Sequence, residues 1–103
     1  MYNTFMSKVN VNHKNSKAVE FNTERNRAHL DLILVKENIY CIVSTYVDDN
    51  LRGKGIGKVL YEAAVEYVRK QNAKFYATCA YAAALADEDK SIKDIYIKDL
   101  TTI

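Results

Sequence analysis

The stretch LRGKGIGK, at residues 51–58, decides the expected fold of this 103-residue chain. It holds all three glycines of the sequence, Gly53, Gly55 and Gly57, with basic residues between and beside them. Glycine lets the backbone bend freely and approach a ligand closely. Because the chain has no other glycine, this cluster indicates a loop that is shaped for binding rather than a simple connection.

An amphipathic helix is expected directly after this stretch, over residues 55–71. Its apolar side chains recur along one stripe at the helical period, the charged ones lie opposite, and Glu66 and Lys70 are spaced to pair. The first N–H groups of a helix lack internal partners, and the helix dipole adds positive charge there. Since no Ser, Thr, Asp or Asn directly precedes the helix as a cap, we expect these amides to be free to bind a phosphate group.

The glycine spacing argues against the common phosphate-binding motifs. A P-loop needs four residues between its first glycine and the Gly-Lys pair, and then Ser or Thr. Here three residues separate Gly53 from Gly57, and Val59 follows Lys58. The dinucleotide-binding motif begins correctly at Gly53 and Gly55, but Lys58 takes its last glycine position and no acid follows about twenty residues later. An RNA-binding signature would need aromatic residues among the glycines, which this stretch lacks.

The pattern that fits is Arg-x-x-Gly-x-Gly, formed by Arg52, Gly55 and Gly57 between a strand-like segment and a helix. It resembles the pyrophosphate-binding loop of the GNAT superfamily, the acetyl-CoA-dependent N-acetyltransferases. The resemblance covers most of the chain. It includes the Thr-x-Val segment at residues 45–47 and the Thr-Cys-Ala-Tyr segment at residues 78–81. The sequence is similar to the small, single-domain GNAT-like members.

The order of predicted elements gives the fold class. Strands rich in β-branched, aromatic or alternating apolar residues are expected at residues 18–22, 28–36, 39–47 and 74–80. The alanine content predicts a second, short helix at residues 81–87. We therefore expect an α+β, GNAT-like domain: a mostly antiparallel mixed sheet, one main helix packed on it and a short C-terminal helix.

Length and composition indicate one domain without a membrane span. We expect residues 1–16 to be a flexible leader and residues 17–103 to form the single GNAT-like acetyltransferase domain. No apolar run approaches the roughly twenty residues that cross a bilayer, and the N-terminus lacks a secretory signal, so a cytoplasmic location is expected. A formal net charge of +2 gives no reason to expect nucleic acid as a partner.

The resemblance implies a set of cofactor-binding residues. The loop residues whose amides and charges would bind the pyrophosphate of acetyl-CoA are Arg52, Gly53, Lys54, Gly55, Ile56, Gly57 and Lys58. The strand residues that would pair with the pantetheine arm are Thr45, Tyr46 and Val47. The acidic run at residues 87–89 is either a solvated face or, if it borders the acceptor channel, a feature that favours a cationic amine.

The catalytic residues are less complete. Relatives usually carry a histidine where this chain has Ser44, so the most obvious base for the amine proton is missing. Cys79 stands where the family has a cysteine beside the thioester, and it either accepts the acetyl group or shapes the pocket. Tyr81, expected on the same strand face as Cys79, either protonates the leaving thiolate or packs against its neighbours. Cys41 is expected to be a core thiol.

The two histidines, His13 and His29, are expected to have no catalytic role, and no metal is expected because neither cysteine has metal-ligand spacing. Together these features predict an acetyl-CoA-binding protein that moves acetyl to an amine of a small molecule or protein. Two alternatives remain: a CoA-binding module with little or no transferase activity, and a protein-interaction domain that has kept only the fold.

Overall fold

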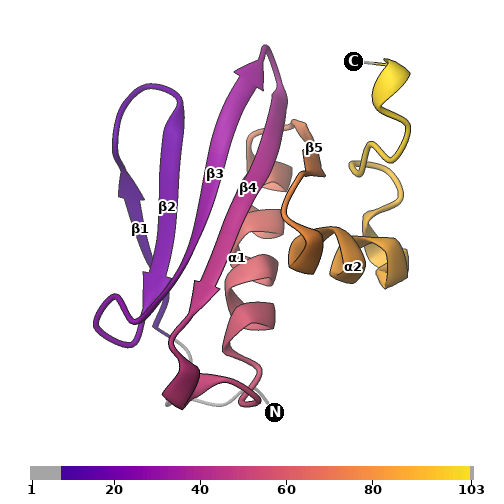
Figure 1. The fold of residues 1–103 in the computed structure, drawn as a ribbon. Coiled ribbons are helices and arrows are strands. Elements are labelled where there is room, and N and C mark those ends of the chain that lie inside the picture. The colour runs from indigo at the N-terminus through magenta and orange to yellow at the C-terminus, as the bar shows by residue number, and fades with distance from the viewer. Residues whose placement is uncertain (1–7, 103) are drawn as a thin grey trace.

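The computed structural model describes residues 8–102. Its strands and α-helices are β1 (Asn10–His13), β2 (Ala18–Thr23), β3 (Ala28–Lys36), β4 (Ile39–Val47), α1 (Ile56–Lys70), β5 (Lys74–Ala77) and α2 (Ala80–Glu88). Short 3-10 helices lie at Asp49–Leu51, Lys90–Ile92 and Leu100–Thr102. The strands form one sheet in the order β1-β2-β3-β4-β5, in which β1 to β4 pair antiparallel and β5 pairs parallel to β4 (Figure 1). The expected α+β class with a mostly antiparallel mixed sheet is confirmed.

The first strand lies within the segment that we expected to be a flexible leader. β1 pairs with β2 through residues such as His13 and Val19, and all four of its side chains are exposed. Residues 1–7 of that segment lie outside the described residues. The sheet therefore extends one strand further toward the N-terminus than residues 17–103 would allow.

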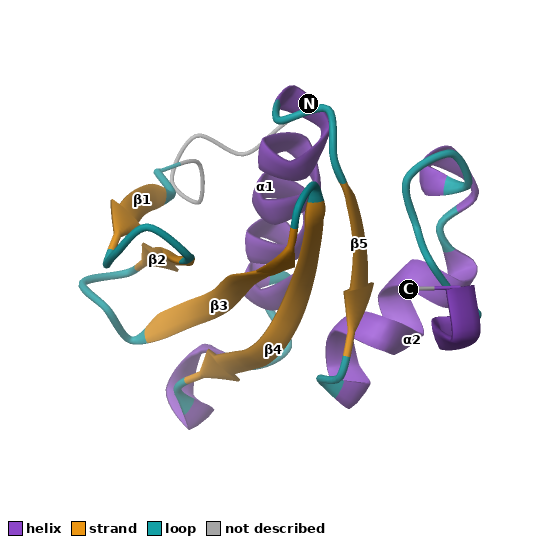
Figure 2. Ribbon diagram, turned by 90° about the horizontal axis from the view of Figure 1, so that it is seen from above, coloured by secondary structure: helices purple, strands orange, loops and turns teal. Residues whose placement is uncertain are grey.

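Helix α1 covers one face of the sheet and builds the core there (Figures 1 and 2). Leu60, Ala64 and Val68 of the helix are fully buried, as are Leu30 and Leu32 of β3. Burying a leucine or valine side chain contributes about 1.5–3 kcal/mol, so this contact is a main source of stability. The helix begins and ends within one residue of its predicted bounds. The expected Glu66–Lys70 ion pair is present, with 3.8 Å between Nζ and Oε2.

The opposite side of the sheet carries no helix among the described residues, and we call it the open face (Figure 2). Cross-strand partners place their side chains on the same face of a sheet. The polar part of the open face follows from the pairs Asn22 with His29, Glu20 with Asp31, Asp31 with Ser44, and His29 with Tyr46. The pairs Ala18 with Ile33 and Ile33 with Cys41 continue the same face. None of the helices among the described residues is long and apolar enough to cross a membrane.

A bulge in β4 decides which residues reach each face. Ser44 pairs with Asp31, but Ile42 pairs with the next residue of β3, Leu32, so Val43 has no partner of its own. An extra residue of this kind shifts the alternation of side chains by one position. Simple alternation along β4 would place the side chains of Ser44 and Ile42 on the same face, whereas the bulge places them on opposite faces.

The bulge instead turns Thr45 toward the helix-covered face. Thr45 pairs with Leu30, whose side chain is fully buried beneath α1. Ser44 and Tyr46, the neighbours of Thr45 in β4, lie on the open face. Directly after the bulge, the side chain of Thr45 therefore lies on the helix-covered face, and the side chains of Ser44 and Tyr46 lie on the open face.

Strand β5 ends three residues earlier than predicted. The N–H groups of Thr78 and Cys79 both donate to the carbonyl of Ile42, at 3.1 and 3.3 Å, and α2 begins at Ala80. Pairing between β4 and β5 stops at Ile42 and Ala77, so residues 43–47 of β4 have no strand partner on the β5 side within the described chain. The sheet opens at this point, between the end of β4 and the start of α2.

Candidate functional site

The loop after β4 is held in shape by local contacts. Leu51 is buried, and the Asp48 side chain accepts a hydrogen bond from the Asn50 N–H at 3.4 Å. Gly53 and Gly55 have φ angles of +81° and +79°, in the left-handed region that residues with a Cβ seldom adopt. These two glycines are therefore required by the turn itself.

The N-terminus of α1 is open to a ligand. Gly55 is its N-cap residue, and no side chain of the described residues caps it. The N–H of Val59 donates to the Gly55 carbonyl at 3.1 Å, so the preceding amides of the first turn are left for another partner. Backbone N–H groups together with the helix dipole make this end favourable for an anion.

A cavity of about 590 Å³ lies against this helix end. Its walls come from β4, the loop, the first turn of α1 and α2; the lining residues are Thr45, Val47, Leu51, Arg52, Gly53, Gly55, Ile56, Gly57 and Tyr81. Most residues that the sequence assigned to the cofactor thus meet at one hollow. Lys54 is exposed on the loop, Lys58 lines a different groove, and the side chain of Tyr46 lies on the open face.

Arg52 is held at the rim of the cavity by its own loop. Its Nε donates to the Val47 carbonyl at 3.1 Å and lies 3.3 Å from Oδ1 of Asp49, while two thirds of the side chain is exposed. An exposed ion pair of this kind holds the side chain weakly. The guanidinium can therefore turn toward an anion at the helix end at little cost.

Tyr81 closes the cavity on the side of α2, and not from a strand as expected. The alanines that begin at residue 80 continue the chain as a helix, so Tyr81 sits in the first turn of α2. Its ring lies against Gly57, where an added Cβ would be 2.6 Å from the Tyr81 hydroxyl. Partial burial raises the pKa of Tyr81, and the nearby Cys79 raises it further. The hydroxyl therefore keeps its proton at neutral pH.

The two cysteines lie on either side of the point where β4 and β5 stop pairing: Cys41 is in the paired part and Cys79 follows it. Cys79 is half-buried at the start of α2, and its Sγ donates to Oγ1 of Thr45 at 3.5 Å. Cys41 is buried, with Sγ 3.7 Å from Oγ1 of Thr78. Both thiols are free, and the expectation that Cys41 is a core thiol is confirmed. Cys79 and Thr45 therefore meet at the inner end of the opening that begins at the glycine loop.

The family model described as GCN5-related N-acetyl-transferase matches residues 18–95. The chain belongs to this family. The matched residues run from β2 through the glycine loop, α1 and β5 to the segment after α2, so they include every element that builds the cavity. The resemblance drawn from the glycine loop is confirmed, and membership of the family implies an acyl-transfer reaction.

Among solved structures, this GCN5-related chain is similar to a GCN5-like candidate N-acetyltransferase from Staphylococcus aureus, determined by NMR. The two are 29% identical with a TM-score of 0.67, and the similarity covers 88% of each chain. A candidate acyl-CoA N-acyltransferase from Klebsiella pneumoniae subsp. pneumoniae is 19% identical with a TM-score of 0.46, over 55% of this chain and 41% of the other. No curated protein matches the chain significantly.

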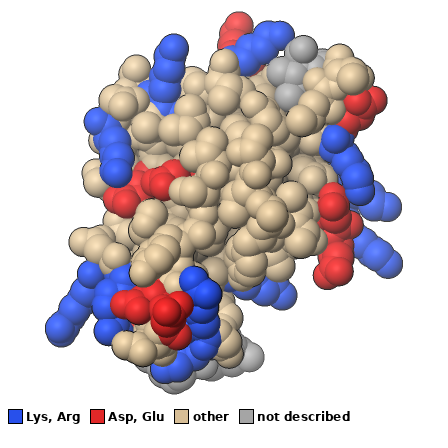
Figure 3. Space-filling model, viewed as in Figure 1, with Lys and Arg blue, Asp and Glu red and all other residues tan. Residues whose placement is uncertain are grey.

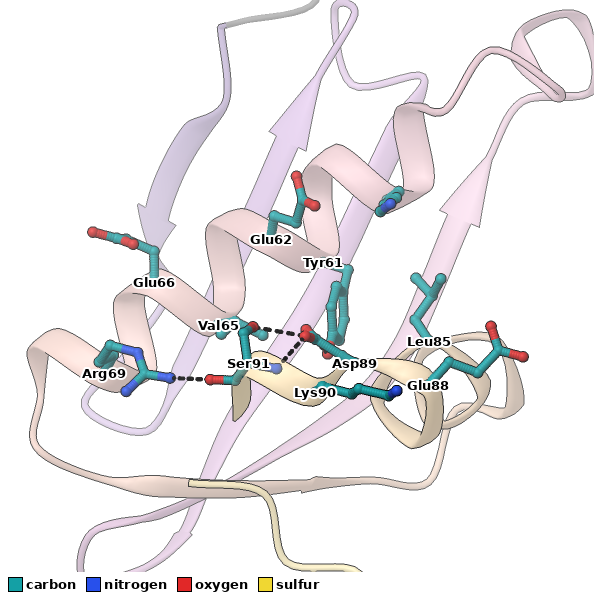
Figure 4. A pocket seen from close by; sticks show the side chains of 11 residues that line it. Tyr61, Glu62, Val65, Glu66, Arg69, Leu85, Glu88, Asp89, Lys90 and Ser91 are labelled. Carbon is teal, nitrogen blue, oxygen red and sulfur yellow. Dashed lines mark hydrogen bonds between the residues drawn. The ribbon is translucent and has the colours of Figure 1, made fainter. Parts of the chain in front are cut away.

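A second groove of this GCN5-related domain, of about 770 Å³, runs between α1 and the segment after α2 (Figure 4). Within it, Asp89 accepts hydrogen bonds from the Tyr61 hydroxyl at 3.1 Å and from the N–H and hydroxyl of Ser91 at 3.0 and 2.6 Å. The Ser91 hydroxyl is the main cause that lowers the pKa of Asp89. Arg69 bonds the Ser91 carbonyl and Asp94. The contacts fasten α1 to the following segment.

This groove also locates the acidic run at residues 87–89. Asp89 is used in the contacts above, and Asp87 accepts from the Tyr96 hydroxyl at 3.1 Å. None of the residues 87–89 lines the cavity at the glycine loop. The run therefore serves the packing of α2 and the C-terminal segment rather than the walls of the candidate site.

Sequence reasoning missed a polar cluster on the open face. The Ser44 hydroxyl donates to Oδ2 of Asp31 at 2.7 Å, and Nδ1 of His29 lies 3.5 Å from the same oxygen. Oε2 of Glu20 is 3.9 Å from Nδ1 and 3.8 Å from Nζ of Lys14. Because both carboxylates already have partners, we assign no metal to this cluster. Alternation placed His29 and Asp31 on one face, but only the bulge in β4 brings Ser44 to them.

Proposed function

We propose that this GCN5-related domain binds acetyl-CoA and transfers the acetyl group to an amine of a small molecule or a protein. The observation that carries the proposal is the cavity where an uncapped helix end, the glycine loop and the unpaired end of β4 meet. Each part offers what one portion of the cofactor needs, in the order in which those portions follow one another.

The pyrophosphate would bind at the helix end. Its charge is favoured by the free amides of the first turn, and the lack of a side chain at Gly57 lets the Tyr81 ring pack against the helix beside this site. Arg52 and Lys54 add positive charge from the loop, and Lys58 adds it from the first turn of α1. This arrangement supports a diphosphate better than a single small anion, because several donors lie along the loop.

The pantetheine arm would lie along the unpaired end of β4. Residues 45–47 lack a strand partner on the β5 side, so their backbone groups on that side can pair with the amides of the arm. The arm would then lead from the glycine loop to Cys79 and Thr45. The thioester is accordingly expected beside these two side chains.

The transfer step joins the amine nitrogen to the acetyl carbon and breaks the bond to sulfur. The leaving thiolate needs a proton, and the Tyr81 hydroxyl, which keeps its own at neutral pH, is our candidate donor. Cys79 has two alternative roles: it accepts the acetyl group before the amine does, or it shapes the pocket around the thioester.

Calorimetric titration with acetyl-CoA tests the binding part of the proposal. We expect saturable binding to the intact protein that weakens at least about tenfold in Gly57→Leu, because a bulky side chain would push the Tyr81 ring out of its place in the cavity wall. Lys36→Ala, on the β3–β4 turn far from the loop in Figure 1, is the matched control. An intact protein that does not bind acetyl-CoA would favour the protein-interaction alternative.

Transfer is tested with labelled acetyl-CoA and a panel of primary amines. Product from the intact protein supports an acetyltransferase, and binding without product on any amine favours the CoA-binding module. Comparison with Cys79→Ala separates the two roles of the thiol. Equal rates for the two proteins would rule out Cys79 as a nucleophile, whereas a loss of transfer with retained binding would support it.

A further inference from the structure

The two faces of the sheet differ in how an acceptor can reach the cavity. The helix-covered face is filled by buried side chains such as Leu30, Leu60 and Ala64. The open face looks toward the viewer in Figures 1 and 3, where the middle of the surface carries few charged side chains and most of them lie around its margin. The open face is therefore the side of the sheet on which an acceptor amine would meet the fewest buried side chains.

Ser44 and Tyr46, the residues on either side of Thr45, both contact the polar cluster on the open face. Ser44 bonds Asp31 at 2.7 Å, and Tyr46 packs against His29 with 5.5 Å between ring centroids. Both neighbours of Thr45 in β4 are thus tied to the pair His29 and Asp31 on β3. The cluster covers the open-face side of the strand segment whose other side carries the Thr45 contact with Cys79.

His29 presents one ring nitrogen to solvent. Its Nδ1 is fully shielded and has no hydrogen-bond partner among the described residues; the nearest acceptors are Asp31 at 3.5 Å and Glu20 at 3.9 Å. The side chain as a whole is 31% exposed, so the exposed part of the ring is the part away from Nδ1. Nε2 is therefore the nitrogen that an acceptor can reach.

We propose that His29 is the base that takes the proton from the acceptor amine, with Asp31 as its positioning residue. The inference rests on the proposed function and revises the expectation that neither histidine has a catalytic role. In relatives, a histidine at the position of Ser44 on β4 would remove the amine proton. Here His29, supported by Asp31, would remove it from the neighbouring strand β3.

Atoms and protons balance in this step. An acceptor that arrives as an ammonium group first gives one proton to Nε2 of His29 and becomes a neutral amine. Its nitrogen then attacks the thioester carbon, the new C–N bond forms and the C–S bond breaks. The nitrogen loses its second proton to solvent, and the thiolate of CoA takes a proton from the Tyr81 hydroxyl. Tyr81 regains a proton from solvent, and His29 releases its proton to solvent. The products are the acetylated amine and free CoA.

The charges around His29 suit a cationic acceptor. The groups that face the ring are Glu20 of β2, Asp31 of β3 and Tyr46 of β4, and Lys14 lies beyond Glu20. The two carboxylates would attract an ammonium group and stabilise the imidazolium once the proton has moved. We therefore expect polyamines and lysine side chains to react faster than uncharged aromatic amines.

The test measures acetyl transfer to spermidine, to a lysine-containing peptide and to aniline by the intact protein, His29→Ala and His29→Gln. We expect kcat on the best acceptor to fall about a hundredfold or more in both variants, with the Kd of acetyl-CoA within about twofold. His13→Ala, which changes the other histidine, should keep the full rate.

A rescue variant excludes a merely structural effect. Ser44→His in the His29→Ala background places an imidazole beside Asp31 from β4, and we expect it to recover at least about tenfold of the lost rate. A His29→Ala protein that keeps kcat within about threefold, or a double variant that binds acetyl-CoA but recovers nothing, would overturn the role of His29. Failure of the intact protein on every amine would instead overturn the proposed transfer, and the inference with it.

Discussion

Gly55 and Gly57 are two residues apart, yet substitution by alanine should have different effects at the two positions. Gly55→Ala should lower stability, whereas Gly57→Ala should weaken ligand binding. An alanine at Gly55 meets no atom within 4 Å, but the φ of +79° is unfavourable for a residue with a Cβ. That conformation costs about 1–2 kcal/mol, so Gly55→Ala should lower Tm by about 4–8 °C for each kcal/mol lost. Thermal unfolding followed by circular dichroism measures the change. An unchanged Tm would contradict the backbone conformation described for the loop.

Gly57→Ala should leave stability nearly unchanged and weaken acetyl-CoA binding. Gly57 lies inside α1, where alanine is favoured over glycine by up to about 1 kcal/mol, but its Cβ would displace the flexible end of Tyr81. The displaced ring would also change the wall of the cavity beside the helix end proposed for the pyrophosphate. We expect Kd to rise at least about tenfold with Tm within about 3 °C. In a Tyr81→Ala background the same change should stabilise the protein, because no ring remains to be moved.

At the scale of the element, the bulge in β4 makes two adjacent apolar residues unequal. Ile42 is 1% exposed and packs in the core, whereas Val43 is 40% exposed and unpaired. Ile42→Ala should cost about 2–4 kcal/mol, and Val43→Ala should stay within about 0.5 kcal/mol. Urea unfolding of the two variants measures both values. Similar losses at the two positions would contradict the pairing register of β3 and β4.

The tie between α1 and the segment after α2 should depend on pH. Because the Ser91 hydroxyl lowers the pKa of Asp89, the folded state is favoured while Asp89 is ionised. This contribution is present above the unfolded pKa of about 3.9 and is lost as the pH falls through the lower folded value. Ser91→Ala should therefore lower stability at pH 7 by about 0.5–1 kcal/mol, and less at pH 3. Asp89→Asn should remove this pH dependence from the comparison.

The sequence predicted the elements better than their ends and faces. Residues 28–36 and 39–47 form strands with the predicted bounds, because long runs of alternating or β-branched residues favour an extended chain. The bulge at Val43 left no signal, since every residue from Val43 to Val47 suits a strand. The early end of β5 was equally hidden, because it depends on two N–H groups that bond the Ile42 carbonyl.

In the candidate site, too, the sequence predicted features formed by neighbouring residues of the chain and missed contacts between strands. The glycine loop and the uncapped helix are local features, and the sequence alone located them. The cluster of His29, Asp31 and Ser44 depends on pairing between strands, so no spacing along the chain revealed it. The serine at position 44, where relatives usually carry a histidine, indicated this part of β4 from the sequence. Only the structure shows that Asp31 and His29 lie next to it.

For the whole molecule, acetyl-CoA should act as a stabiliser whose effect depends on its phosphates. A ligand present at a hundredfold excess over its Kd adds about 2.7 kcal/mol, which would raise Tm by roughly 10 °C or more. S-acetylpantetheine, which lacks the pyrophosphate, should give a much smaller shift at the same concentration. Added salt should reduce the shift from acetyl-CoA because the contacts at the loop are partly electrostatic. Equal shifts from the two compounds would contradict a phosphate site at α1.

The parallel pairing of β5 with β4 has a consequence for the order of folding. Strands β1 to β4 contact their neighbours in the sequence, whereas β5 reaches β4 only after the whole of α1 has been made. Closing so long a connection costs chain entropy and is slow compared with forming a hairpin. The opening beside β4 would thus be completed after the other strands of the sheet have paired. We expect acetyl-CoA to slow unfolding while leaving the refolding rate unchanged, since its binding site is absent until the final strand has docked.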